Sequence, residues 1–290
     1  MAVQVIAEVG ECFNGSMEQA RKMIKEAARA GCNIVKFQIL DMDEVSADDP
    51  EFEWFRKIEL DRESIKLLKR WAENEHIDIL FTPVSVKTAS FLVEEAIDTV
   101  KIASSFIRKK ELIEYVNNHF RIVYVSTGMA DLNEVRNAVE MLKKPDEVVI
   151  LHCISEYPTG PLLEQRKLKA LSEQDAHLNM IHILKREFPV HRIGYSDHTD
   201  GIFVPVIAAA MGAKVIEKHF TLDRRTPIHN YMEKKEYMGT DHVLSVEPED
   251  LGKMVELIHR VEACQGDMEW YRSEGEIILR DFLRGRYTER

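Results

Sequence analysis

The sequence lacks long apolar runs, an N-terminal export signal and a metal-binding cysteine pattern. No stretch approaches the roughly 18 apolar residues that a membrane helix needs, so we expect no membrane-spanning segment. The N-terminus has no basic stretch followed by an apolar run and a small-residue cleavage site. The spacing of Cys12, Cys32, Cys153 and Cys264 fits no zinc motif. We therefore expect a cytoplasmic protein with reduced thiols.

The chain also lacks an excess of positive charge. Its 39 Lys and Arg are outnumbered by 50 Asp and Glu, and the net charge is −11. Nucleic acid is therefore excluded as an expected partner, because a phosphate backbone needs a basic face. A small anionic substrate remains possible where basic groups gather locally. The length of 290 residues and the hydrophobic share of 45% are typical of one (β/α)8 barrel.

Eight short runs rich in Val and Ile alternate with longer amphipathic segments. The runs mostly lack a polar face, as strands buried on both sides do. We predict strands over 5–10, 33–39, 78–84, 99–104, 121–128, 148–154, 192–197 and 213–220. We predict helices over 17–30, 61–76, 87–96, 109–118, 131–142, 168–188, 201–211 and 248–262. Eight such units predict an α/β fold, namely a closed (β/α)8 TIM barrel. An open doubly wound sheet is the alternative, but no G-x-G-x-x-G motif follows the first predicted strand.

Two segments do not fit the repeat. Residues 222–245 are too long for an ordinary loop, and residues 265–290 form a tail that ends in several arginines. Too few residues follow the eighth helix for a second core. We therefore assign residues 1–264 to a catalytic barrel and residues 265–290 to a C-terminal tail.

Polar side chains gather at the carboxyl ends of the predicted strands, where such barrels place their active sites. These ends carry Glu8, Lys36, Gln38, Thr82, Lys101, Ser104, Ser126, Ser155, Tyr157, Ser196, His198, Glu217 and His219. One such residue alone is more often structural than catalytic. Polar residues at the same end of all eight strands, however, predict a functional site.

Two lysines and two histidines define the expected chemistry. Lys36 and Lys101 would repel each other in a barrel mouth unless an anion lay between them, so with nearby hydroxyls they predict a site for a carboxylate and a phosphate. His198 and His219 end adjacent strands, and with Glu217 or water they could hold Mn²⁺, Zn²⁺ or Fe²⁺. A histidine pair in a plain hydrogen-bond network is the alternative.

At this point the sequence resembles the sialic acid (N-acetylneuraminate) synthase family over residues 3 to about 250. The matching motifs, in order, are IAEVG (6–10), VKFQ (35–38), FTP (81–83), KIAS (101–104), STGM (126–129), LHC (151–153), EYP (156–158), GYSDHT (194–199) and IEKHF (216–220). The resemblance implies a barrel that condenses phosphoenolpyruvate with an N-acylated hexose aldehyde to give a nonulosonic acid and phosphate.

The resemblance also implies roles for individual residues. Those implied to bind substrate are Lys36, Gln38, Thr82, Lys101, Ser104, Ser126, Ser155 and Ser196, with Tyr157 and Asp241 on the sugar. His198 and His219 would hold a divalent metal, with Mn²⁺ expected first and Mg²⁺, Zn²⁺, Fe²⁺ or Co²⁺ as alternatives. Glu8 and Glu217 would belong to the catalytic set together with the two lysines.

The chain departs from the family pattern in four places. Glu11-Cys12-Phe13 stands where members usually have Asn-His, and a segment from Thr226 to His229 replaces Pro-Gly-Pro-Asp. Phe106 stands where many members have a glutamate near the acceptor sugar, so we expect an acceptor more deoxygenated or more apolar than N-acetylmannosamine. The family's antifreeze-like C-terminal domain is not found before Arg290, and the tail from Ser273 resembles the start of its linker.

Several alternatives stay open. Residues 222–245, the tail arginines or a separate subunit could close the barrel mouth, and the chain could form a homodimer. A second possible enzyme is another phosphoenolpyruvate-dependent ulosonic acid synthase, because the residues that bind phosphoenolpyruvate would be the same in both. A non-catalytic barrel subunit is the third possibility, although such a subunit has no need to cluster charges in the mouth.

Overall fold

The structure is a computed structural model of the chain and describes residues 2–49, 51–156, 171–230, 235–238, 240–267 and 269–286. Eight parallel strands form its centre, and all eight predicted strands are confirmed. They are β1 (Gln4–Gly10), β2 (Ile34–Ile39), β3 (Asp78–Pro83), β4 (Thr99–Ile102), β5 (Ile122–Ser126), β6 (Glu147–Cys153), β7 (Arg192–Asp197) and β8 (Val215–His219).

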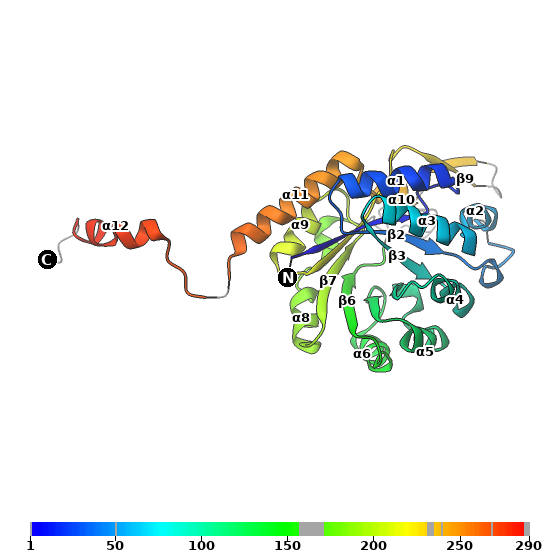
Figure 1. Cartoon of the computed structure of the whole chain (residues 1–290), viewed down its shortest axis with the longest axis horizontal. Coiled ribbons are helices and arrows are strands. Elements are labelled where there is room, and N and C mark those ends of the chain that lie inside the picture. Colours follow the sequence, from blue (N-terminus) through cyan, green and yellow to red (C-terminus); the bar gives the residue numbers. More distant parts are fainter. Residues whose placement is uncertain are drawn as a thin grey trace.

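The eight strands close into a barrel that helices surround (Figure 1). Hydrogen bonds join them in the order β3-β2-β1-β8-β7-β6-β5-β4, and β3 and β4 lie side by side at the remaining seam. The predicted (β/α)8 barrel is thereby confirmed, because chain order and neighbour order agree around the ring.

Helices follow the strands much as predicted. They are α1 (Met17–Arg29), α3 (Arg62–Asn74), α4 (Val86–Glu94), α5 (Lys110–His119), α6 (Leu132–Met141), α8 (Met180–Glu187), α9 (Phe203–Ala210) and α11 (Pro248–Gln265). Side chains of Ser16, Asp61, Ser85 and Asp131 cap four of them by accepting from backbone N–H groups in the first turn.

The helix predicted over 168–188 is wrong in its extent. Within the described part, from residue 171 on, the structure has a short 3-10 helix, η3 (Glu173–Ala176), and then α8. His177 separates the two with a left-handed backbone, φ 44°. A non-glycine residue with positive φ interrupts a right-handed helix, and the apolar periodicity of the segment gave no sign of it.

The barrel has an apolar layer beneath its polar mouth. This inner cluster consists of Ile6, Ile34, Leu80, Tyr124, Val149, Leu151 and Val215. On β2, Ile34 lies in this layer and Lys36 comes two residues later, on the same face of the strand. This strand thus delivers an apolar side chain to the core and a polar one to the mouth.

Further elements were not predicted. They are α2 (Phe52–Ile58), η1 (Met42–Glu44), η2 (Ser104–Phe106), the antiparallel pair β9 (Pro227–Asn230) and β10 (Lys235–Met238), α10 (Thr240–Leu244) and α12 (Glu274–Arg284). The long segment after β8 therefore contains a hairpin and a short helix, and α2 packs beside β9.

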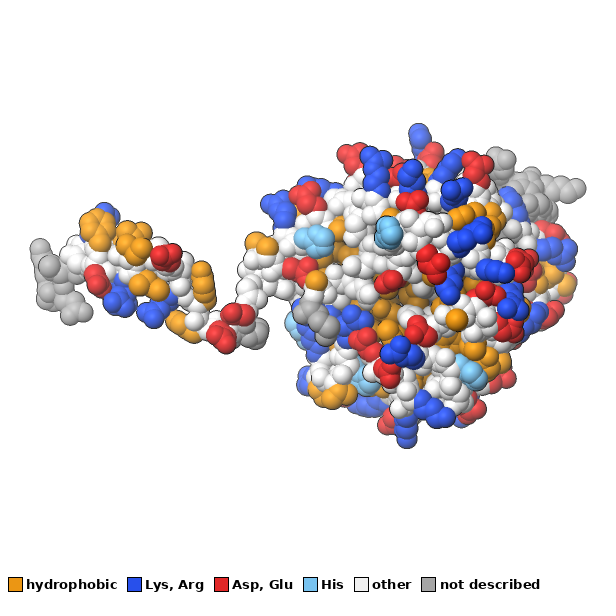
Figure 2. Space-filling model, in the orientation of Figure 1, with side chains coloured by type: hydrophobic (Ala, Val, Ile, Leu, Met, Phe, Trp, Pro, Cys, Tyr) orange, Lys and Arg blue, Asp and Glu red, His pale blue; other side chains and the backbone are white. Residues whose placement is uncertain are grey.

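The helix α12 stands away from the barrel at the end of an extended link (Figure 1). Its apolar side chains are exposed, including Ile278 and Phe282 at 70% and 59% (Figure 2). Arg284 ends this helix, so the tail arginines among the described residues do not reach the barrel mouth. Among the residues that the structure describes, no helix is long and apolar enough to cross a membrane.

Candidate active site

An ion-pair cluster fills the centre of the barrel mouth. Glu217 on β8 lies between the two lysines: its Oε2 is 3.2 Å from Lys36 Nζ, and its Oε1 pairs with Lys101 Nζ. Lys36 Nζ also lies 3.2 Å from Glu8 Oε2, and all four side chains are buried. From the sequence we expected a substrate anion to separate the lysines, whereas in the structure a carboxylate of the chain itself does so.

The charged groups of this cluster shift one another's pKa values. Burial alone would raise the pKa of Glu217, but Lys101 and Lys36 hold it well below its ordinary value. Burial, with Glu217 nearby, raises the pKa of Glu8. Burial lowers the pKa of Lys101, although Glu217 opposes that shift. Because the two carboxylates balance the two ammonium groups, an anionic ligand would have to compete with Glu217 for Lys101.

Neutral donors surround this cluster. Gln38 Nε2 donates to Glu8 Oε1 at 2.9 Å, and Ser196 Oγ donates to Glu217 Oε1 at 2.7 Å. These two bonds orient the carboxylates. Thr82 Oγ1 in turn accepts from Lys36 Nζ at 3.4 Å. The predicted residues on β1, β2, β3, β7 and β8 therefore come together at one point.

Three serines lie on the β4–β6 side of the mouth. Ser104 Oγ and Ser155 Oγ are 2.6 Å apart. Gly128 leaves room for this pair, because a Cβ there would fall 2.0 Å from Ser155 Oγ. Ser126 Oγ is buried and has no hydrogen-bond partner within the described ranges. Unpaired buried hydroxyls are costly, so this side is suited to a ligand that accepts hydrogen bonds, such as an oxyanion.

A hollow of about 520 Å³ opens beside these serines, at the ends of β5 and β6. Gly128, Cys153, Ser155 and Glu156 are among the residues that line it. Ser155 can therefore be reached from outside the barrel. Tyr157, predicted to contact the sugar, lies outside the described residues.

The two predicted histidines face each other at the ends of β7 and β8. Their ring centroids are 5.3 Å apart, and Asp241 Oδ2 lies 3.6 Å from His219 Nδ1. Burial lowers the pKa of His198 to about 4 and that of His219 well below its ordinary value. Both rings are therefore neutral near pH 7, which is the form that binds metal ions.

This pair fits a divalent metal ion. His219 Nδ1 is buried without a hydrogen-bond partner in the part of the chain that the structure describes. That same part holds no group of three or more His, Cys, Asp or Glu arranged to bind a metal. The protein would therefore supply two ring nitrogens and leave further positions to water or substrate, as catalytic metal sites commonly do.

Glu11 belongs to the site and was not predicted to be functional. Its backbone N–H donates to Asp241 Oδ2 at 3.3 Å, and its own carboxylate accepts from Trp54 Nε1 at 2.6 Å. Gly10 makes room for Asp241, since a Cβ there would fall 2.3 Å from Asp241 Oδ2. One sign of this role is present in the sequence, because Glu11 departs from the family pattern. Its partner Trp54 could not be foreseen, since it lies on α2, a helix that was not predicted.

We expect Glu11→Gln to stabilise the protein at high pH. Burial raises the pKa of Glu11 to about 7, from an ordinary value of 4.5. The folded state thus holds this proton more tightly than the unfolded state does, so stability is lost as the pH rises from 4.5 through 7. Glutamine stays neutral and can still accept from Trp54. The thermal unfolding midpoint of the variant should exceed that of the wild type at pH 8 by more than at pH 5. An equal difference at both pH values would contradict this.

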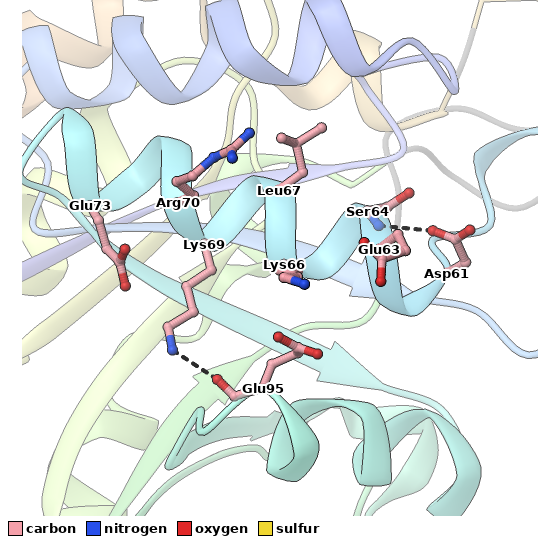
Figure 3. Close-up of a pocket in the computed structure, with 9 residues that line it drawn as sticks. All are labelled: Asp61, Glu63, Ser64, Lys66, Leu67, Lys69, Arg70, Glu73 and Glu95. Carbon is pink, nitrogen blue, oxygen red and sulfur yellow. Dashed lines mark hydrogen bonds between the residues drawn. The ribbon is translucent and has the colours of Figure 1, made fainter.

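Another hollow, of about 640 Å³, lies on the outer face of α3 (Figure 3). Charges of both signs line it: Asp61, Glu63, Lys66, Lys69, Arg70, Glu73 and Glu95. Lys69 Nζ already donates to the backbone oxygen of Glu95 at 2.8 Å. No predicted site residue lines this hollow, so the barrel mouth remains the candidate active site.

Comparisons with known proteins agree on one family. The model of the NeuB family matches residues 23–270. N,N'-diacetyllegionaminic acid synthase of Legionella pneumophila is 31% identical over 100% of this chain and 81% of its own length. An uncharacterized protein of Methanocaldococcus jannaschii is 36% identical over 91% of this chain and 72% of its own length. The crystal structure of N-acetylneuraminic acid synthetase from Leptospira borgpetersenii superposes with a TM-score of 0.83 at 31% identity, covering 98% of this chain and 92% of that one.

Proposed function

Because this chain belongs to the NeuB family, we propose that it condenses phosphoenolpyruvate with an N-acylated hexose to give a nonulosonic acid and phosphate. The observation that carries the proposal is the convergence of two lysines, several serine hydroxyl groups and two neutral histidines at one end of the barrel. A scaffold has no need for such a cluster, because burying charge is costly.

The donor half of the site is proposed to bind phosphoenolpyruvate. Lys36 and Lys101 offset negative charge on its carboxylate and phosphate, and hydrogen bonds from hydroxyl groups fix their orientation. The proposed hydroxyl and amide partners are Gln38, Thr82, Ser104, Ser126, Ser155 and Ser196. The Ser126 hydroxyl, which has no hydrogen-bond partner among the described residues, supports this assignment, since a bound oxyanion would complete its hydrogen bonding.

The acceptor half is proposed to contain the metal. His198 and His219 would hold a divalent ion, with Mn²⁺ as the first expectation. Such an ion, when bound, acts as a Lewis acid on the acceptor aldehyde. Asp241, beside His219, and Tyr157 are proposed to orient the sugar.

The proposed reaction forms a carbon–carbon bond and replaces the C2–O bond to phosphate by one to water. C3 of phosphoenolpyruvate forms a bond to the aldehyde carbon, and Lys36 and Lys101 hold the donor in place during this attack. Water adds to C2, and a carboxylate of the cluster, Glu8 or Glu217, takes its proton. The carboxylate passes this proton to the former aldehyde oxygen, which becomes a hydroxyl. The C2–O bond to phosphate then breaks, phosphate leaves with that oxygen and takes the proton of the new C2 hydroxyl, and C2 becomes the keto carbon.

We expect an acceptor other than plain N-acetylmannosamine. Phe106 packs against the core, with Lys109 Nζ 5.9 Å from its ring centre, and offers no hydrogen-bond acceptor to a sugar hydroxyl. A buried hydroxyl that loses its partner costs roughly 1–3 kcal/mol. A deoxygenated or diacetamido acceptor should therefore show a kcat/KM about tenfold or more above that of N-acetylmannosamine. Equal or better use of N-acetylmannosamine would contradict this.

The proposed function is tested by phosphate release from phosphoenolpyruvate across a panel of sugars. We expect release that depends on both phosphoenolpyruvate and an N-acylated hexose. Release only with shorter phosphorylated aldoses would favour another ulosonic acid synthase. Absence of release with every sugar, in the presence of Mn²⁺, would favour a non-catalytic barrel. The panel should include N-acetylmannosamine and its 6-deoxy and diacetamido analogues.

A further inference from the structure

Two charged residues of the family motifs have no place in the proposed chemistry. Asp197 and Lys218 alternate with the site residues of β7 and β8, and they are paired directly across the two strands. Because successive side chains of a strand point to opposite faces, both point away from the barrel mouth. Each is nonetheless buried, with exposed fractions of 1% and 0%.

Asp197 and Lys218 form the centre of a compact hydrogen-bond network. Lys218 Nζ lies 2.7 Å from Asp197 Oδ2 and also donates to the backbone oxygen of Thr199. Tyr195 donates its hydroxyl to Asp197 Oδ1 at 2.7 Å, and Thr199 Oγ1 does so at 2.8 Å. The Thr199 backbone N–H donates to the same oxygen at 3.2 Å. Both oxygens of Asp197 are therefore engaged.

This network holds the turn that carries His198 from both sides. Asp197 precedes His198 and Thr199 follows it, and Lys218 contacts both of these neighbours. Lys218 itself stands on β8 between Glu217 and His219. The turn that presents one histidine is thus tied to the strand that presents the other.

A buried ion pair is a poor way to gain stability alone. Removing two charges from water is costly, and an apolar pair of similar size is often as stable or more so. What such a pair can supply is one fixed geometry. Here the geometry that it fixes is the approach of two imidazole rings, whose centroids lie 5.3 Å apart.

We propose that the Asp197–Lys218 pair is a positioning device that sets the two histidine rings at the spacing one divalent ion requires. The inference rests on the proposed function, because it presumes that His198 and His219 bind a metal. It assigns to Asp197 and Lys218 a task that the reaction itself does not explain. Partners behind metal ligands typically change metal affinity by about 10–100-fold when replaced.

The test compares Mn²⁺ affinity with fold stability in matched variants. Asp197→Asn/Lys218→Met removes both charges and so leaves no unpaired buried charge. The control is Glu147→Gln/Arg192→Met, which removes an ion pair of 2.9 Å at the opposite end of β6 and β7. The dissociation constant for Mn²⁺ is measured from the electron paramagnetic resonance signal of free Mn²⁺, and the unfolding midpoint is measured without metal.

We expect the Asp197→Asn/Lys218→Met protein to bind Mn²⁺ about 10–100-fold more weakly, and the control to bind it as the wild type does. If the wild type binds Mn²⁺ and the Asp197→Asn/Lys218→Met variant binds it equally well, the positioning role is overturned and the metal site is kept. Failure of the wild type to bind Mn²⁺ would instead reject the proposed metal site. If the double variant does not fold, Tyr195→Phe decides: a several-fold weaker affinity supports the proposal, and an unchanged affinity overturns it.

Discussion

Replacing Lys101 with methionine is expected to lower the affinity for phosphoenolpyruvate more than tenfold, and Lys36→Met should do the same. Methionine keeps much of the side-chain bulk but removes the charge that the donor's anionic groups need. Loss of one partner from a desolvated charge pair typically costs about 2–5 kcal/mol. Titration calorimetry with phosphoenolpyruvate measures the change directly.

A control is needed because Glu217 contacts both lysines. Either substitution leaves this buried carboxylate with one ammonium partner fewer, which also weakens the fold. The unfolding midpoint should therefore be measured beside the affinity. Lys69→Met, on the outer face of α3, removes a lysine far from the mouth and should leave binding unchanged. Normal binding by both Lys36→Met and Lys101→Met would show that the donor site lies elsewhere.

The double variant His198→Ala/His219→Ala is expected to lose both its metal and its activity. The two ring nitrogens are the ligands that the protein is proposed to supply, and alanine has none. A Lewis acid contributes several kcal/mol to such a reaction, so the rate should fall by at least about a hundredfold. Metal analysis of protein dialysed against Mn²⁺ gives the content independently of the rate.

His152→Gln is the matched control for this loss. His152 is also a buried strand histidine, but its Nε2 lies 2.8 Å from the backbone oxygen of Ala176, outside the metal pair. We expect this variant to retain its metal. Unchanged metal content and unchanged activity in His198→Ala/His219→Ala would rule out the assignment of both ligands.

The barrel could be predicted because its strands obey a simple pattern. Apolar runs buried on both sides recur eight times, and polar residues stand at one end of each run. The gathering of Lys36, Lys101 and the two histidines at the mouth then follows from the topology, since parallel strands end on the same side of a barrel. Sequence spacing alone places these side chains near one another, but not in contact.

The contacts themselves depend on tertiary geometry. Glu217 bridges Lys36 and Lys101, and these three residues lie on three different strands. No local pattern encodes which carboxylate contacts which lysine. The Trp54–Glu11 bond joins α2 to the turn after β1, and the relative position of these two segments is fixed only by the closed barrel. The break at His177 depends on one non-glycine residue with a left-handed backbone, and the local sequence does not specify that conformation.

Carbon-13 NMR of [3-¹³C]phosphoenolpyruvate incubated with the protein, Mn²⁺ and an N-acylated hexose tests the proposed condensation most directly. Formation of the new carbon–carbon bond converts the vinyl carbon into a methylene carbon of the product. We predict that the vinyl signal is replaced by a methylene signal in a one-to-one ratio with released phosphate. A vinyl signal that persists with every N-acylated hexose, or one that becomes the methyl signal of pyruvate, would contradict the account.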